Sequence, residues 1–584
     1  MNRNSESHFA QIPHADISRS KFYRNSDHKT TFNAGQLIPI YCDEVLPGDT
    51  HQMDMSALIR MSTPIFPTMD NLFCDFYFFF VPNRLVWNHW KEFMGENTES
   101  YWTQPTEYQV PIIDTETDKN KNENLKGTQT GTTLDYFGIP TGIDGLKINA
   151  LPQRAYQLIW NEWFRDQNIQ QPCEIPLDET TVKLKSTEYE KHNSKEAYDY
   201  FKKNYVTKAK EGYAPLPVNK YHDYFTSCLP QPQKGTAVLL PISGNAPIRS
   251  YIDENMTQQA VAIGKSPNYY SPWTWGGTEA ELTQTYDLKE PPNFFQSRML
   301  GKAKEGYEFV TQENKNPTKT AYIGADLSAV TGATINQLRQ AFQIQKLLER
   351  DARGGTRYTE ILKAHFNVTS PDSRQQRPEY LGGYRMPINI TQVVQNSETT
   401  ATSPQGNTAA FSVSGMNKSM FTKSFTEHGY IIGLAAVRTE HTYQQGIERM
   451  WSRKGRYDFY WPELANIGEQ AVLNKEIYAQ GTDADEEAFG YQEAWADYRY
   501  KPSRVSGDMR SNYKQTLDSW HYADYYAEQP KLSSQWMMET MNNIDRTLAV
   551  QSSVEDQFIA DFYFKAQTTR PMPVYSVPGL IDHH

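Results

Sequence analysis

Two segments of this sequence are apolar on both faces of a β-strand, and they constrain the fold more than any other feature. They are residues 72–81 (LFCDFYFFFV) and residues 430–437 (YIIGLAAV). A strand of this kind has both of its faces covered, so each segment is expected in the middle of a core. The longer segment is too short to cross a bilayer and also carries Asp75.

Further strand patterns recur along the chain, separated by long connections. Residues 35–45 and about 236–242 have strand character, and residues 558–566 alternate with a period of two. One face of this last segment carries Phe558, Ala560, Phe562, Phe564 and Ala566. No fixed repeat is visible, which disfavours solenoids and propellers. The pattern predicts a mainly β protein, a sandwich with enlarged loops.

Two helices are predicted between these strands. Thr334 and Gln337 form a capping-box pattern at the start of a helix over residues 334–351, which Gly354 and Gly355 terminate. Its apolar face would consist of Ile335, Leu338, Phe342, Leu347 and Leu348. A shorter amphipathic helix is predicted at about 152–168, where Ala155, Leu158, Ile159 and Trp163 share a face.

Four segments differ in composition from the strands. Residues 1–30 are a polar, mildly basic arm, and residues 112–133 have the composition of an exposed loop. Residues 171–212 are charged and rich in Tyr, with helical spacing at 188–210. Residues 243–326 combine Pro, Gly and aromatic residues without clear periodicity, which predicts an insertion with a small fold of its own.

Composition limits the class of protein. Aromatic residues reach 13% of 584 residues, which favours pleated sheets and large contact surfaces over helical bundles. The net charge of −11 argues against coating nucleic acid with the whole surface, so any such contact is local. The beginning of the chain has no apolar signal segment, and the cysteines Cys42, Cys74, Cys173 and Cys228 are scattered. Both observations predict reduced thiols and a protein made and kept inside a cell.

Catalytic and metal-binding motifs receive little support. Gly264, Lys265 and Ser266 resemble the end of a phosphate-binding loop, but Gln259 stands where the first glycine is required. The acidic residues of 483–487 depart from the EF-hand pattern at Ala488, so we interpret them as a solvated loop. No catalytic, cofactor-binding or metal-binding residue is predicted, and the chain is not expected to be an enzyme.

Two stretches interleave basic and aromatic residues. They are residues 449–457 (RMWSRKGRY) and residues 498–504 (YRYKPSR). Such mixtures suit single-stranded nucleic acid, because bases stack on rings while guanidinium groups contact phosphates. They suit protein interfaces equally, since Tyr, Trp and Arg are the usual anchors there. The sequence leaves both interpretations open.

Long strings of residues resemble one protein family almost from end to end. Examples are YCDEVLPGDT (41–50), FFFVPNRLVW (78–87), INQLRQAFQIQKLLERDARGGTRYTEILKAHF (335–366), MWSRKGRYDFYWP (450–462) and RPMPVYSVPGLIDH (570–583). They are similar to the major capsid protein of gokushoviruses, small single-stranded-DNA bacteriophages of the Microviridae. The similarity fades at 112–133 and 171–212, and most of all at 243–326.

The resemblance implies an eight-stranded antiparallel jelly roll that assembles into a T=1 icosahedral virion capsid in the bacterial host cytoplasm. Residues 31–242 would form the first part of the jelly roll, with variable loops at 112–133 and 171–212. Residues 243–326 would form a protruding surface insertion that meets a host surface receptor. Residues 327–584 would hold the helix, the remaining strands and long inter-subunit loops. Further implied partners are a circular single-stranded DNA genome, a small basic DNA-binding protein, an internal scaffolding protein and a minor (pilot) protein, without membrane insertion.

Charge adds an expectation about the interior of such a shell. About sixty acidic copies, the order of the icosahedral rotation group, would enclose acidic DNA, so the inner face must be locally basic or another basic component must offset the phosphates. We hypothesise that the arm, residues 1–30, faces inward. The candidate DNA-contact residues are Arg3, Arg19, Lys21, Arg24 and Lys29, and more weakly Arg453, Lys454 and Arg456.

Two other classes of protein remain as alternatives. A carbohydrate-binding or carbohydrate-active β-sandwich would also explain the Tyr and Trp content, and an adhesin would bind through residues 243–326 alone. The cluster NYYSPWTWGG (268–277) would then stack on sugars, although ordinary packing of a folded insertion is the simpler reading. The host-contact candidates in this cluster are Tyr269, Tyr270, Trp273 and Trp275.

Overall fold

The computed structural model describes residues 18–97, 107–116, 127–183, 214–236, 334–396 and 408–575, isolated positions at 238, 399 and 405–406, and the backbone of short strands between 248 and 325. The chain divides into two compact units. The larger consists of residues 1–235 and 348–584, and the smaller of residues 236–347.

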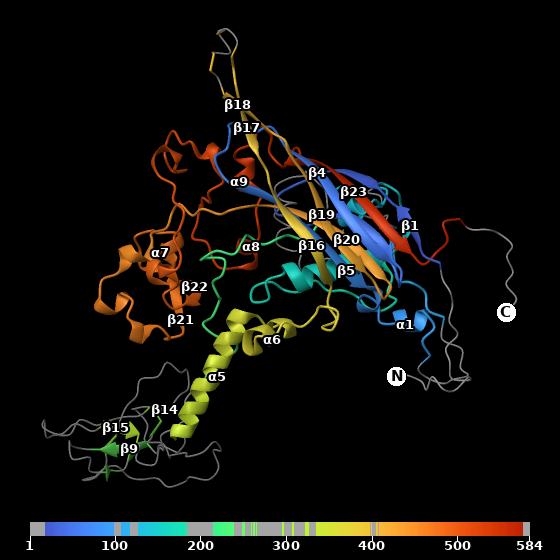
Figure 1. Ribbon diagram of the computed structural model, residues 1–584. Coiled ribbons are helices and arrows are strands. Elements are labelled where there is room, and N and C mark those ends of the chain that lie inside the picture. Colours follow the sequence, from blue (N-terminus) through green and yellow to red (C-terminus); the bar gives the residue numbers. More distant parts are fainter. Residues whose placement is uncertain are drawn as a thin grey trace. The chain divides into compact units, whose positions relative to one another are not determined.

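Two antiparallel sheets form the centre of the larger unit (Figure 1). The first, called the β4 sheet, contains β1 (Ser20–Tyr23), β2 (Ser26–Phe32), β23 (Phe558–Arg570), β4 (Thr50–Met61) and β19 (Ser414–Ser424). The second, called the β5 sheet, contains β16 (Glu379–Pro387), β5 (Leu72–Pro82), β20 (Gly429–Thr439) and β3 (Ile38–Val45). The prediction of a mainly β, antiparallel sandwich is confirmed.

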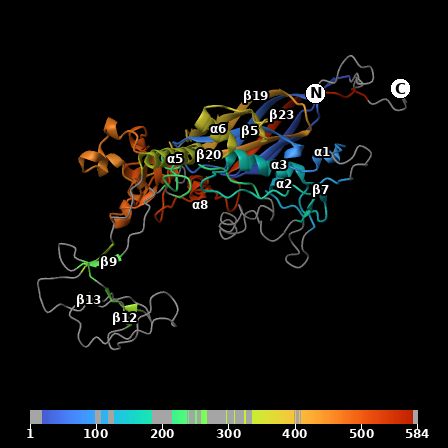
Figure 2. The same ribbon diagram turned by 90° about the horizontal axis from the view of Figure 1, so that it is seen from below.

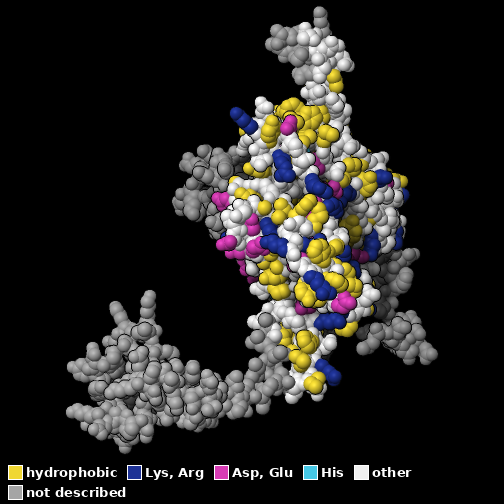
Figure 3. Space-filling model, turned by 90° about the vertical axis from the view of Figure 1, so that its left-hand side faces the viewer, with side chains coloured by type: hydrophobic (Ala, Val, Ile, Leu, Met, Phe, Trp, Pro, Cys, Tyr) yellow, Lys and Arg dark blue, Asp and Glu magenta, His cyan; other side chains and the backbone are white. Residues whose placement is uncertain are grey.

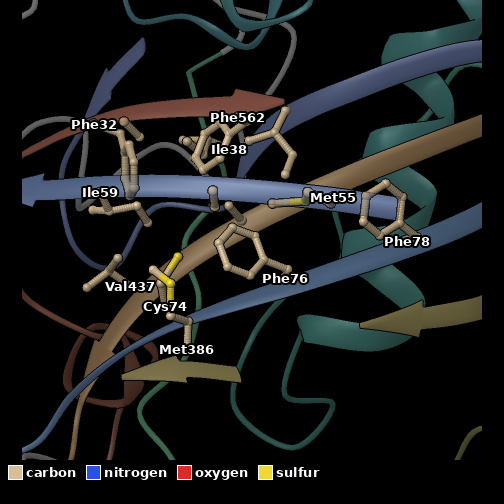
Figure 4. Packing of buried hydrophobic residues seen from close by; sticks show 14 of the residues in the cluster. Phe32, Ile38, Met55, Ile59, Cys74, Phe76, Phe78, Met386, Val437 and Phe562 are labelled. Atoms are coloured by element: carbon tan, nitrogen blue, oxygen red, sulfur yellow. The ribbon is translucent and has the colours of Figure 1, made fainter. Parts of the chain in front are cut away.

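The main core lies between the inner faces of the two sheets. Figure 4 shows Phe562 of β23 and Phe76 of β5 among its residues, and their ring centroids are 5.9 Å apart. The period of two in β23 places Phe558, Phe562 and Phe564 inward, where all three are buried. The alternation seen in the sequence therefore marks the inner face of this strand.

A second core explains why two strands are apolar on both faces. The outer face of the β5 sheet carries Phe79, Val81, Ile432 and Leu434, which pack against α3 (Leu151–Ile159). Figure 2 shows α3 on the same side of the sandwich as the short helices α1 (Trp90–Phe93) and α2 (Thr133–Tyr136). Because helices cover this face, β5 and β20 have no solvent side, as predicted.

Both predicted helices are present. The shorter one is α3, which a π-helical turn at Trp160–Phe164 follows. The longer one is α5 (Ile335–Gly354), and its capping box is formed as expected, since Gln337 N–H donates to Thr334 Oγ1 and Thr334 N–H donates to Gln337 Oε1. Its predicted apolar face is not buried, because Ile335, Phe342 and Leu347 are exposed. Gly355 has a φ of +90°, a left-handed conformation that ends the helix.

The remaining elements of the larger unit are short. They are β6 (Ile112–Asp114), β7 (Lys147–Asn149), β8 (Val182–Lys183), β17 (Ile390–Val394), β18 (Thr408–Ser412), β21 (Glu469–Leu473), β22 (Ala488–Glu493), α6 (Tyr358–Phe366), α7 (Asn474–Ile477), α8 (Ser534–Met537) and α9 (Asn542–Asp545). The smaller unit contains β9 (Ile248–Tyr251), β10 (Gln258–Gln259), β11 (Val261–Ala262), β12 (Gly264–Lys265), β13 (Phe295–Gln296), β14 (Tyr307–Glu308) and β15 (Tyr322–Ala325).

Two segments differ from the sequence expectation. Residues 20–32 of the expected arm form β1 and β2, which pair with β23 and belong to the sandwich. The segment 112–133 is not simply an exposed loop, because Ile113, Thr115 and Thr133 are buried.

The helical spacing at 188–210 and the expected strand at 236–242 lie outside the described residues, apart from two positions of the latter. Of the helices in the described ranges, none has both the length and the apolar character of a membrane span.

Candidate functional site: a basic and aromatic cleft

The two basic and aromatic stretches of the sequence line one cleft in the larger unit. The cleft has a volume of about 780 Å³ and is lined by residues from 443–453 and 497–506, together with Tyr224, Phe225, Glu476 and Arg510. We call it the basic cleft. Residues 458–497 separate the two stretches in the sequence, and the fold of this intervening chain brings them together.

A small aromatic core forms the floor of the basic cleft. Tyr224, Phe225 and Tyr443 are buried together with residues of β21, β22, α7 and α8. The ring of Tyr500 stacks on Tyr224 with centroids 5.0 Å apart. These rings fix the position of the second basic stretch, so the cleft rests on packed side chains rather than on a free loop.

A buried carboxylate lies at the floor among these rings. Glu476 accepts a hydrogen bond from Tyr224 Oη at 2.9 Å and faces Arg449 Nη1 at 3.3 Å. Burial raises the pKa of the Glu476 carboxyl, and Arg449 opposes that shift. Arg449 also donates to the carbonyl of Ala471 at 2.8 Å, which ties the first basic stretch to β21.

The cleft wall carries more cations than carboxylates. Six cations line it against three carboxylates, an excess of three formal positive charges; they are Arg449, Arg453, Arg499, Lys501, Arg504 and Arg510 against Glu448, Glu476 and Asp497. Glu448 forms ion pairs with both Lys501 and Arg504, and Arg453 pairs with Asp497. The excess charge gives this wall an attraction for an anionic partner even though most of its cations have a protein partner.

Large aromatic side chains of the first basic stretch are exposed. The exposed fraction is 72% for Trp451 and 73% for Tyr457. Figure 3 shows Lys and Arg side chains interspersed with hydrophobic ones over this side of the molecule. An exposed surface of this kind is typical of a contact with another macromolecule.

The predicted DNA-contact residues of the first stretch differ in solvent exposure and in their contacts. Arg453 lies over the ring of Tyr498 at 4.2 Å and donates to the carbonyl of Asp458 at 2.8 Å. Arg456 is exposed and lies 4.8 Å from the ring of Trp461. Lys454 is exposed, and its backbone N–H donates to Asp458 Oδ2. Arg456 and Lys454 are therefore the more accessible cations.

The candidates of the arm lie elsewhere, on and beside β1 and β2. Arg19 donates to Gly48 O and Thr50 Oγ1, Arg24 pairs with Asp43, and Lys29 pairs with Asp27. Lys21 lies 5.3 Å from the ring of Tyr23. The DNA-contact candidate Arg3 and the four host-contact candidates, Tyr269, Tyr270, Trp273 and Trp275, lie outside the described residues.

Two of the acidic residues of 483–487 have structural partners. Asp485 is buried and accepts hydrogen bonds from the backbone N–H groups of Gln480 and Gly481, at 2.9 and 2.7 Å. Glu486 pairs with Lys475 at 2.7 Å. Among the residues that the structure describes, no group of three His, Cys, Asp or Glu side chains is placed to hold a metal ion.

Sequence reasoning missed a buried ionic network. His441 lies between two carboxylates, with Nδ1 2.8 Å from Asp524 and Nε2 3.0 Å from Glu539. Lys220 Nζ is 3.5 Å from Asp524 and 4.6 Å from the ring of Trp536. Burial alone would lower the pKa of His441, but the two carboxylates raise it to about 10. The four charged residues are spread over more than 300 positions of the sequence, so no local sequence pattern indicates that they meet.

An antiparallel β-sandwich with long loops and an exposed basic and aromatic cleft is consistent with a structural, contact-forming protein, and viral capsid proteins are one class with such a sandwich. Comparison with known proteins places it within that class. The chain belongs to the family described as "Capsid protein (F protein)", whose model matches residues 10–580.

Three relatives named "Capsid protein VP1" are similar over nearly their whole length. Identity is 42% over 581 residues with that of Bdellovibrio phage phiMH2K, covering 99% of this chain and 98% of the relative. It is 40% over 604 residues for Chlamydia phage 1 and 42% over 582 residues for Spiroplasma virus 4, each covering 98% of this chain and 97% of the relative. The resemblance drawn from the sequence motifs is confirmed, and the protein is a structural major capsid protein.

Proposed function

We propose that copies of this chain assemble into a closed T=1 icosahedral shell around a circular single-stranded DNA genome. The full-length match to capsid proteins carries this proposal. The strand order supports a jelly roll, because the orders β2-β23-β4-β19 and β16-β5-β20-β3 place the first strand beside the last and interleave the others. The large exposed aromatic surface also supports it, since neighbouring copies would cover that surface.

The partners follow from charge and from the family. Each copy carries a net charge of −11, so the protein as a whole does not neutralise enclosed phosphates. A small basic DNA-binding protein would supply the missing charge, while an internal scaffolding protein and a pilot protein would act in assembly and delivery in the host cytoplasm. Residues 243–326 would protrude outward and contact a host receptor.

Within the shell, the basic cleft is the better-supported DNA contact. Its excess positive charge and exposed Trp451 match what a single strand requires, namely phosphate neutralisation and base stacking. In the arm, Arg24 and Lys29 already face carboxylates of the sandwich. The carbohydrate-binding alternative receives no support from the comparisons.

Replacing the two accessible cations of the first basic stretch, Lys454→Gln with Arg456→Gln, is expected to reduce the DNA held by the particles. On a single strand each phosphate contact contributes about 0.7 to the slope of log affinity against log salt, so losing two contacts should lower the slope by about 1.4. Purified particles would be opened gently, and retention of nuclease-protected DNA would be measured across a salt series. Lys91→Gln with Lys147→Gln, two exposed lysines outside both basic stretches, is the matched control. Identical retention in both double variants would remove Lys454 and Arg456 from the DNA contact.

The structure also changes how the arm hypothesis is tested. Removing residues 1–30 would delete β1 and most of β2, and a loss of DNA would then be confused with a damaged sheet. Removing residues 2–17 leaves both strands in place. If the arm faces inward and binds DNA, these shortened particles should hold less DNA than the full-length chain; unchanged DNA content would contradict a role for Arg3 and its neighbours.

A further inference from the structure

A two-stranded ribbon, β17 paired with β18, extends beyond the ends of the two sheets (Figure 1). It continues β16 of one sheet and leads into β19 of the other. The ladder contains five residue pairs, from Ile390 with Ser412 to Val394 with Thr408. An isolated two-stranded ribbon is marginally stable in water, so this ribbon is expected to need a lateral partner.

The two faces of the ribbon differ. At its base, Ala410 and Ser412 are buried against the larger unit. The opposite face carries Thr391 beside Phe411 and Val393 beside Ala409, because paired residues of an antiparallel ladder share a face. Phe411 is 43% exposed and Val393 is 45% exposed. We call this exposed face the free face of the ribbon.

The same apolar surface continues onto the outer face of the β4 sheet. Val413 is exposed, and Gly415 pairs with exposed Leu58 of β4. Ile559 of β23 is exposed beside them and pairs with Arg60. The β5 sheet has α3 on its outer face, whereas these apolar side chains of the β4 sheet remain uncovered.

A groove of about 600 Å³ lies on this outer face. It is lined by His28, Lys29, Thr30, Thr31, Leu58, Arg60, Thr130, Asp135, Tyr136, Ile559, Ala560 and Asp561. Two cations and two carboxylates balance each other in this lining, and Leu58, Ile559 and Tyr136 provide apolar surface. The groove therefore suits an uncharged, partly apolar occupant, in contrast to the positively charged basic cleft.

The ribbon is itself nearly uncharged and partly apolar. Residues 386–416 contain a single ionisable side chain, Glu398, although charged residues make up 22% of the chain. A surface so poor in charge does not suit nucleic acid or a strongly charged protein. Its exposed Val and Phe side chains suit a neutral apolar groove instead.

We propose that the free face of the ribbon of one copy docks on the outer face of the β4 sheet of a second copy, in the groove beside Leu58 and Ile559. The proposal rests on the proposed shell, which brings copies of the chain side by side. Every copy carries both ribbon and groove, so the same contact repeats around a closed assembly. The five paired residues span about 16 Å, long enough to cover several strands of a sheet.

Cross-linking inside assembled particles tests the identity of the occupant. Phe411 is replaced by p-benzoylphenylalanine, and particles are assembled from equal amounts of light and heavy isotope-labelled chains. After illumination, mass spectrometry is expected to show cross-links from position 411 to residues 28–31, 58–60, 130–136 or 559–561, half of them joining light to heavy chains. Cross-links confined to one chain, cross-links to another protein, or none at all would each overturn the docking. The same label at Tyr457, an exposed residue of the first basic stretch that does not line the groove, should not reach the groove.

A pair of substitutions on neighbouring residues separates the two faces of the ribbon. Thr391→Asp adds a charge to the free face, and Gln392→Asp adds the same charge to the opposite face; both side chains are exposed. Thr391→Asp is expected to lower the yield of particles at least tenfold while the circular dichroism and melting temperature of the unassembled chain stay unchanged, and Gln392→Asp should assemble as the unsubstituted protein does. Equal yields from the two variants would contradict the proposal.

The two proposals fail in different ways. If the unsubstituted chain formed no particles under any condition, including co-expression with candidate partners, both the shell and the docking would be overturned. If particles formed without cross-links from the ribbon to the groove, the docking alone would be overturned.

Discussion

Replacing Asp524 by asparagine is expected to lower the free energy of unfolding by about 3–5 kcal/mol, the usual cost of breaking a buried ion pair on one side. Asp524 is buried and faces His441 and Lys220, so asparagine would leave two cations without their shared carboxylate. Denaturant unfolding of the unassembled subunit measures the change. Asp483→Asn, at an exposed position, is the matched control and should change stability by less than about 0.5 kcal/mol. Equal effects from the two substitutions would show that the network contributes nothing.

The same network is expected to make the free energy of unfolding depend on pH. The pKa of His441 is raised from 6.5 to about 10 in the folded chain, so its contribution is fully present below about pH 6.5 and is lost as the pH rises through about 10. Burial would raise the pKa of Asp524, but His441 and Lys220 lower it overall, so its contribution is present above its ordinary pKa and is lost only in strong acid. The stability difference between the unsubstituted chain and Asp524→Asn should therefore be larger at pH 6 than at pH 10. A difference that grew with pH would contradict a charged His441.

Local patterns in the sequence predicted those strands in which the hydrophobic pattern directly reflects which faces are buried. Residues 72–81 and 430–437 became β5 and β20, covered on both faces, and the alternation at 558–566 became β23. β4 was missed although His51, Met53, Met55, Ala57, Ile59 and Met61 alternate along it and are all buried. β1 and β2 were missed for a physical reason, because edge strands with mostly exposed side chains carry little apolar signal.

The basic cleft was likewise predictable from the sequence only in part. The composition of residues 449–457 and 498–504 marked both as contact surfaces, but their meeting in one cleft depends on the packing of Tyr224, Tyr443 and Tyr500 between them. Long-range packing of this kind has no signature in either stretch. The ribbon was also not predicted, because its short, uncharged strands have the composition of an ordinary loop and only their pairing identifies them.

Replacing Phe562 by alanine is the substitution expected to damage the sandwich most directly. Phe562 is fully buried between the sheets, with its ring against Phe76, and removing such a ring costs about 3–5 kcal/mol because a cavity remains between two rigid layers. Tyr563→Ala, one residue further along β23, removes a ring from the outer face, where 39% of the residue is exposed. Its cost should stay below about 1 kcal/mol, since no cavity forms. Thermal unfolding of the two unassembled variants compares neighbouring positions on the two faces of one strand. A smaller loss for Phe562→Ala than for Tyr563→Ala would reverse the inner and outer faces of β23, and with them the assignment of the groove to the outside of the β4 sheet.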